Sequence, residues 1–233
     1  MKRIAILETG APPPALAETH GDYPAMFRAL LGDEYAFETF RSQAGEWPHP
    51  DVFDAAIITG SAAGVYEDAP WIADLLDWIH SAKGRTRLIG ICFGHQAMAQ
   101  ALGGRVEKSE RGWGVGLHRY DVVAPEPWMD PPAATFAIPV SHQDQVVEKP
   151  ADARVIARSD FTPFAALAWD DDAISFQGHP EFTRAYAADL TAGRRDRIGP
   201  EIVDPALDSL SRPDDRARVE QWLRRFIAGP DPA

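Results

Sequence analysis

The only cysteine of the 233-residue chain stands at the end of an apolar segment. Cys92 follows the run Leu88 to Ile91 and is flanked by Gly90 and Gly94. An apolar strand that turns sharply into a helix with a nucleophile at the turn is typical of a nucleophile elbow. Glycines fit such a turn because larger side chains would collide there, and the following helix N-terminus favours a thiolate. Cys92 is therefore a candidate nucleophile, although this motif alone also fits a small buried hydrophobe.

A histidine and a glutamate follow a second apolar strand. The segment Ser175 to Glu181 leaves that strand and delivers His179 and Glu181 two positions apart. Residues i and i+2 of an extended segment point to the same side, and Pro180 disfavours helix at His179. Glu181 can therefore orient the imidazole while its other nitrogen faces a thiol, which completes a nucleophile, a base and an orienting group. An isolated surface turn is the alternative, but it leaves the second strand end unexplained.

The two motifs together closely resemble those of the class I glutamine amidotransferases, over about residues 1 to 190. Gly90 to Gln96 matches the family's Gly-x-Cys-x-Gly-x-Gln, and His179 to Glu181 matches its His-Pro-Glu. The resemblance implies a Cys, His, Glu triad in this chain order. It also implies that Gln96 contacts the substrate and that the backbone N–H of Phe93 forms half of an oxyanion hole.

The loop Thr59 to Val65 resembles the family's Gly-Gly-Pro segment. The resemblance implies that the Gly60 N–H is the other oxyanion donor and that Ser61 lies at the substrate. The match is incomplete, because Ser61 and Ala62 replace the second Gly and the Pro. An ordinary turn after a strand is the alternative interpretation of this loop.

The segment Val140 to Asp144 resembles the family's Ser-His-Gly-Asp, which holds the amino-acid end of the substrate. By this resemblance Ser141, His142 and Gln143 are candidate substrate-binding residues, with His142 expected to be mainly structural. Gln143 in place of Gly is similar to a subgroup of free-standing members. This free-standing subgroup resembles the amidotransferase domain of GMP synthase.

The elements that must position these residues alternate between strand and helix. Apolar runs predict strands at Arg3 to Leu7, Ala55 to Thr59, Arg87 to Ile91 and Ala173 to Phe176. Helical spacing predicts helices at Tyr23 to Leu31, Pro70 to Lys83 and Phe93 to Leu102. We therefore expect an α/β fold with a mostly parallel open sheet flanked by helices, and the resemblance implies a flavodoxin-like one.

Two other regions depart from this alternation. Short strands between Pro-rich and Asp-rich turns, from Gly112 to Trp169, predict a small antiparallel addition to the sheet. Beyond residue 183 we expect a helix at 184–190, a loop centred on Gly199-Pro200 and an amphipathic helix at 213–227. Residues 1–190 are predicted to form the amidotransferase domain, and 191–233 a helical C-terminal extension of the same domain.

Composition excludes several classes of function. The net charge of −12 argues against binding to nucleic acid or to an anionic membrane surface. No apolar run approaches the roughly 20 residues that cross a bilayer, and the single cysteine predicts a reducing, cytoplasmic setting. Neither a P-loop nor a dinucleotide-binding motif is present, so we expect no cofactor, and no metal site is predicted. A small molecule or a peptide is the better substrate class.

Three hypotheses of function follow. The first is a glutaminase that cleaves the γ-amide of glutamine through a Cys92 thioester and passes ammonia to a separate synthase partner. The second is a stand-alone γ-glutamyl peptidase or hydrolase, which needs no partner. The third is a catalytically silent binding domain, which the presence of Cys92, His179 and Glu181 makes the least favoured.

Overall fold

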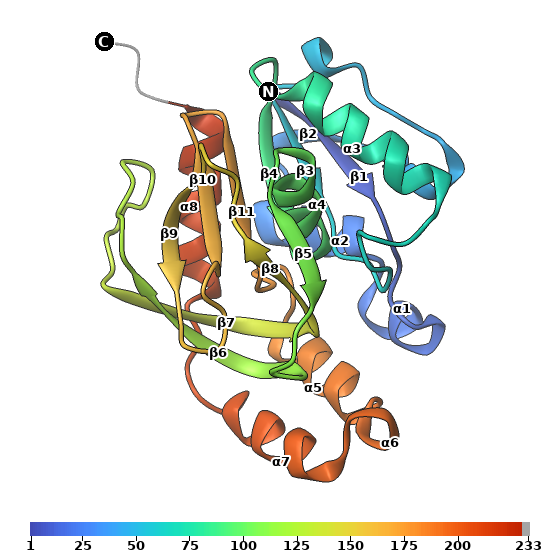
Figure 1. Ribbon diagram of the computed structural model, residues 1–233, viewed down its shortest axis with the longest axis vertical. Coiled ribbons are helices and arrows are strands. Elements are labelled where there is room, and N and C mark those ends of the chain that lie inside the picture. The colour runs from blue at the N-terminus through green and yellow to red at the C-terminus, as the bar shows by residue number, and fades with distance from the viewer. Residues whose placement is uncertain (230–233) are drawn as a thin grey trace.

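The computed structural model describes residues 1–229 and is built on a nine-stranded sheet. The strand order is β2-β1-β3-β4-β11-β10-β9-β6-β7 (Figure 1). The strands are β1 (Lys2–Glu8), β2 (Tyr35–Arg41), β3 (Ala55–Ile58), β4 (Arg87–Ile91), β6 (Gly114–Val122), β7 (Thr135–His142), β9 (Arg154–Arg158), β10 (Ala166–Trp169) and β11 (Ala173–Phe176). A separate antiparallel ribbon pairs β5 (Arg105–Lys108) with β8 (Asp144–Glu148).

The strands from β2 to β11 pair in parallel, and those from β11 to β7 pair antiparallel. The expected α/β architecture, mostly parallel with an antiparallel addition, is confirmed. Parallel strands need crossover connections, and the helical stretches seen in the sequence provide them.

Helices cover both faces of the parallel part. They are α2 (Tyr23–Leu31) and α8 (Arg216–Ala228) on one face, and α3 (Pro70–Ala82) and α4 (Phe93–Ala101) on the other. Side chains of a strand point alternately to the two faces. Ile4 and Ile6 therefore pack with α2 and α8, whereas Ala5 and Leu7 pack with α3 and α4.

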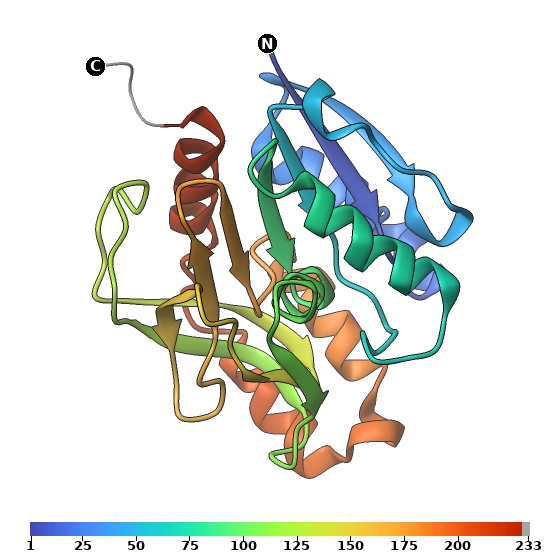
Figure 2. The same cartoon turned by 45° about the horizontal axis from the view of Figure 1, so that its top comes forward.

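Further helices lie at the end of the sheet to which the parallel strands point (Figures 1 and 2). They are α1 (Pro14–His20), α5 (Arg184–Ala192), α6 (Arg195–Ile198) and α7 (Pro200–Ser209). Elsewhere in the fold, two short 3-10 helices span Ser42–Ala44 and Pro50–Val52. The expected loop at Gly199-Pro200 is wrong, because α7 begins at Pro200. Proline is tolerated in the first turn of a helix, where its missing N–H has no partner to lose.

The last helix, α8, is part of the core. Its residues Trp222, Leu223 and Ile227 are fully buried, and the Trp222 Nε1–H donates to the Pro131 carbonyl oxygen over 3.0 Å. The division of the chain at residue 190 stays a prediction. Within residues 1–229, none of the helices combines the length and apolarity that a bilayer crossing requires.

Replacing Trp222 by Ala should destabilise the whole fold. The substitution empties a fully buried site between α8 and the sheet, and such changes typically cost about 3–5 kcal/mol in free energy of unfolding. Urea denaturation measures the loss. The matched control is Gln221→Ala, on the exposed side of the same helix, which should change stability by no more than about 0.5 kcal/mol. Equal stability of the two variants would contradict this role of α8.

Candidate active site

Cys92 occupies a strained turn between β4 and α4. Its backbone has φ 53° and ψ −101°, a conformation that costs a non-glycine residue free energy and that clusters at functional sites. The Cys92 N–H donates to the Phe176 carbonyl oxygen over 2.8 Å, and the Gly94 N–H donates to the Thr59 carbonyl oxygen over 3.2 Å. A Cβ at Gly94 would lie 2.2 Å from the Ile58 carbonyl oxygen, so only glycine fits there. The elbow predicted from the sequence is present.

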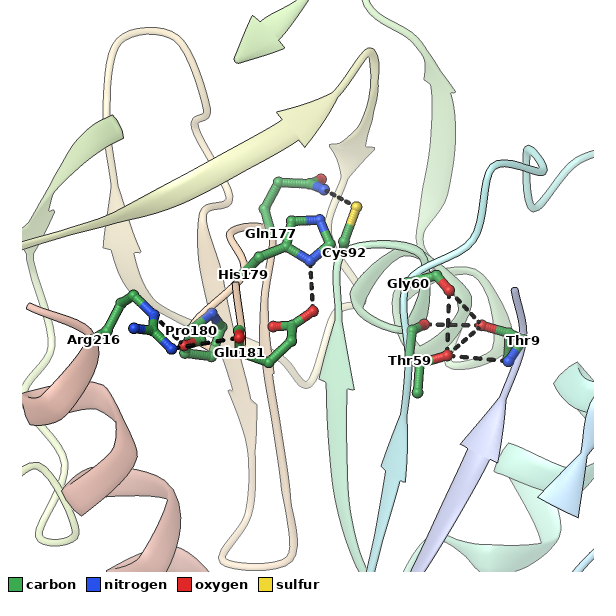
Figure 3. Close-up of polar contacts among 9 residues, drawn as sticks. All are labelled: Thr9, Thr59, Gly60, Cys92, Gln177, His179, Pro180, Glu181 and Arg216. Atoms are coloured by element: carbon green, nitrogen blue, oxygen red, sulfur yellow. Dashed lines mark hydrogen bonds and ion pairs between the residues drawn. The ribbon is translucent and has the colours of Figure 1, made fainter. Parts of the chain in front are cut away.

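His179 and Glu181 leave the neighbouring strand at the same edge. The parallel pairing of β4 with β11 sets Ile91 opposite Phe176, so both strands end at one level. His179 Nδ1 and Glu181 Oε1 are 2.7 Å apart, and both side chains are almost fully buried. Figure 3 shows the imidazole ring between the carboxylate and the sulfur of Cys92. The structure therefore places the three predicted triad residues together.

The charges of this cluster stabilise a protonated imidazole. Burial by itself lowers the pKa of His179, because it penalises the charged form. The Glu181 carboxylate, and then the negative charge of a Cys92 thiolate, outweigh burial and raise the pKa of His179 to about 10. The ring therefore keeps its proton at neutral pH and can give it up only to a more basic group.

Two contacts fix the position of the His179–Glu181 pair. The Phe182 ring stacks on the His179 ring with centroids 3.8 Å apart and an interplanar angle of 6°. From α8, the guanidinium of Arg216 donates to the carbonyl oxygens of Pro180, at 2.8 Å, and Glu181, at 3.4 Å (Figure 3). The last helix therefore holds the backbone that carries the pair.

The two expected oxyanion donors lie beside Cys92. A Cβ at Gly60 would lie 3.0 Å from His179 Cε1 and 3.9 Å from Cys92 Cβ, so this backbone borders both side chains. The Thr9 and Thr59 hydroxyls both donate to the Gly60 carbonyl oxygen over 3.2 Å (Figure 3). Phe93 is the first residue of α4, where an N–H has no partner within the helix. Within residues 1–229 neither the Gly60 nor the Phe93 N–H donates a hydrogen bond.

The expected substrate-binding residues surround a cavity of about 210 Å³ that reaches Cys92. Its lining includes Ser61, Gln96, Ser141, His142 and Gln143. A second cavity, of about 430 Å³, shares Cys92, Ser61 and Ser141 and extends past His179 to Tyr23, Phe182 and Leu190. Cys92 therefore lies where the two cavities meet.

Within the smaller cavity, Gln96 and His142 are both buried and tied to the same residue. Gln96 Nε2 donates to the Asp144 carbonyl oxygen over 2.9 Å, and His142 Nδ1 lies 3.2 Å from that oxygen. Burial lowers the pKa of His142 to about 3, so its ring is neutral at pH 7. A neutral, buried His142 is consistent with the mainly structural role that the sequence predicts for it.

Several residues at the site are not predicted from the sequence. Gln177 Nε2 lies 3.7 Å from Cys92 Sγ, and Gln177 Oε1 accepts from Gln96 at 3.3 Å. The sequence held a signal for Gln177, because a residue two positions before His179 in an extended segment points to the same side as His179. Arg194 and Arg197 line both cavities, but they lie just before α6 and within it, where no spacing in the sequence relates them to Cys92 or His179.

No group of three or more histidine, cysteine or acidic side chains within residues 1–229 is arranged to hold a metal ion.

Glu181→Gln should lower the pKa of His179. The substitution removes the carboxylate that contributes most to raising the pKa and leaves the burial that lowers it, so the ring should lose its proton at a lower pH than in the wild type. Nitrogen NMR of the imidazole between pH 5 and pH 10 measures this, with exposed His80 on α3 as internal control. A His179 that titrates alike in both proteins would show that Glu181 does not set its charge.

Comparison with known proteins identifies the family of this chain. The family model described as "Glutamine amidotransferase class-I" matches residues 39–188. Gamma-glutamyl peptidase 2 of Arabidopsis thaliana is 27% identical over 241 residues, covering 98% of this chain and 97% of that protein. The glutamine-hydrolysing GMP synthase of Thermosipho melanesiensis is 36% identical over 132 residues, covering 55% of this chain and 24% of the synthase.

The fold also matches a solved structure. The crystal structure of a glutamine amidotransferase from Thermotoga maritima has a TM-score of 0.79 and 16% sequence identity, and the match covers 97% of this chain and 98% of that one. Fold and family model agree, and the chain belongs to the class I glutamine amidotransferase family.

Proposed function

We propose that this protein hydrolyses γ-glutamyl amide bonds through a thioester on Cys92, with His179 as acid and base and Glu181 as the orienting carboxylate. The observation that carries the proposal is the strained Cys92 turn with the buried His179–Glu181 pair at the same sheet edge. A nucleophile next to a base that is held by a third group is the arrangement that acyl transfer requires.

Acylation begins when the Cys92 thiolate attacks the γ-carbonyl carbon and a C–S bond forms. The negative charge moves to the carbonyl oxygen, where the Gly60 and Phe93 amides stabilise it. Losing one such donor typically costs about 2.7–4 kcal/mol in transition-state stabilisation. The imidazolium of His179 donates its proton to the leaving nitrogen, the C–N bond breaks, and an amine or ammonia departs. The γ-glutamyl group remains on the sulfur as a thioester.

Deacylation uses the same residues in the opposite sense. The imidazole of His179, now neutral, accepts a proton from water while the hydroxide attacks the thioester carbonyl. The C–S bond breaks, glutamate leaves, and the thiolate and imidazolium are restored. Throughout, the 2.7 Å contact with Glu181 keeps the ring oriented and stabilises its charged form.

A stand-alone γ-glutamyl peptidase is the form of this activity that we favour. The similarity to gamma-glutamyl peptidase 2 runs over nearly the whole of both chains, which supports this choice. The cavity of about 430 Å³ that passes His179 also supports this choice, because the group that protonates the leaving nitrogen lines a space larger than ammonia needs.

A glutaminase that supplies ammonia to a synthase partner is the second candidate. The similarity to the glutamine-hydrolysing GMP synthase supports it, over a matched region that spans 24% of that longer protein. In this case the same Cys92 chemistry acts on glutamine, and ammonia is the leaving group.

The substrate is tested by offering the purified protein glutamine and a set of γ-glutamyl dipeptides and measuring glutamate release. We expect dipeptides to be hydrolysed faster than glutamine. The reverse preference would replace the peptidase proposal by the glutaminase one. Absence of turnover with every compound, by a correctly folded protein, would favour a binding domain or a subunit that needs its partner.

Cys92→Ala should reduce turnover by a factor of roughly 10⁴ or more, since removal of a nucleophile has an effect of this order in comparable triads. The mutated side chain is small, so the melting temperature should stay close to that of the wild type. Retained turnover in this variant would eliminate Cys92 as the nucleophile.

A further inference from the structure

Among residues 1–229, two arginines next to the nucleophile have no carboxylate partner. Arg194 directly precedes α6 and is half-buried, and Arg197 within α6 is exposed. Both line the two cavities that meet at Cys92. Within residues 1–229 neither forms an ion pair, whereas Arg195, between them, pairs with Asp204. A buried or half-buried cation without a partner is costly, which makes an anionic ligand the natural complement.

The two guanidinium groups are held in place by neighbouring side chains. Both lie over the indole of Trp113, at 5.4 Å for Arg194 and 4.9 Å for Arg197 from the ring centroid. Arg194 Nη1 also donates to the hydroxyl of Ser141. Stacking on an aromatic ring fixes a guanidinium plane while leaving its N–H edge free to bind a carboxylate. The pair is therefore ordered before any ligand arrives.

The charges around the arginine pair make it a selective site for an anion. The chain carries a net charge of −12, which repels anions in general. The carboxylates that line the smaller cavity are already engaged. Glu67 accepts from the Gly64 N–H at 2.6 Å, and Asp144 accepts from the Tyr66 hydroxyl at 3.1 Å. Lys108, the third cation of the lining, lies near Asp144, so the two arginines are the cationic groups of the cavity that have no carboxylate beside them within residues 1–229.

We propose that Arg194 and Arg197, stacked on Trp113, bind a carboxylate of the γ-glutamyl substrate and so select anionic substrates at Cys92. This inference rests on the proposed function and deepens it. The carboxylate has two sources, namely the α-carboxylate of the glutamyl group and the carboxylate of a leaving amino acid or peptide. Both present the same planar anion to the arginines.

Alkylation of Cys92 tests the proposal without any substrate. Cys92 is the only cysteine, so reaction with iodoacetate or iodoacetamide reports on this site alone. The two reagents differ in charge, and the ratio of their rates cancels changes in the reactivity of the sulfur. We expect the iodoacetate to iodoacetamide ratio to fall roughly tenfold in R194Q/R197Q, the order expected when charged hydrogen bonds are lost. R197Q, which keeps the contact between Arg194 and Ser141, should show part of this fall.

The matched control is R195Q, which removes the same charge from the same helix at a residue that pairs with Asp204. Its alkylation ratio should equal that of the wild type. Melting temperatures of all variants exclude unfolding as the cause of a change. An equal ratio in wild type, R197Q and R194Q/R197Q would overturn the proposal, whatever the enzyme proves to hydrolyse.

Substrate kinetics then identify the carboxylate. γ-Glutamylalanine and γ-glutamylalaninamide differ only in the charge of the leaving group. If Arg197 binds the leaving group, R197Q should lose roughly tenfold in kcat/KM on the acid and little on the amide. If it binds the glutamyl carboxylate, both substrates should lose equally. If kcat/KM is the same in R197Q and R195Q on both substrates, the arginines do not bind a substrate carboxylate. If the wild type is inactive on both compounds, the peptidase function is refuted, but the alkylation result still stands.

Discussion

The site depends above all on the parallel pairing of β4 with β11. Their register ends both strands at one level, and the bond from the Cys92 N–H to the Phe176 carbonyl oxygen joins the elbow to the strand that leads to His179. Residues far apart in the chain are thereby placed within reach of one another. The strained backbone of Cys92 persists because Gly94 packs directly against the Ile58 backbone and leaves the turn no room to relax.

The C-terminal helices complete what this sheet edge begins. The family model ends at residue 188, yet Arg194, Arg197 and Arg216 all lie beyond it and all contact the site or its supports. Arg216 holds the backbone of Pro180 and Glu181 from α8, which is anchored in the core by Trp222. Helix α8 thus links the stability of the fold to the position of the His179–Glu181 pair.

Much of the fold was predictable from local patterns. The strand at Ala173–Phe176 and the helix at Tyr23–Leu31 have the bounds that apolar spacing predicts. The proximity of Cys92, His179 and Glu181 followed from glycines and prolines that restrict the chain locally. The arginine pair did not follow, because its contact with Trp113 depends on how α6 packs against the end of β6. Helix α7 was missed because prolines at 200 and 205 resemble loop signals.

The central claim is that Cys92 carries the γ-glutamyl group during turnover. It is tested most directly by acid-quenching the enzyme with a γ-glutamyl dipeptide within its first turnovers and measuring the intact protein mass. The account predicts a species heavier by one glutamyl group, located on Cys92 by peptide mapping and removed by hydroxylamine. Turnover with no acylated protein at any quench time, or with the label on another residue, would contradict it.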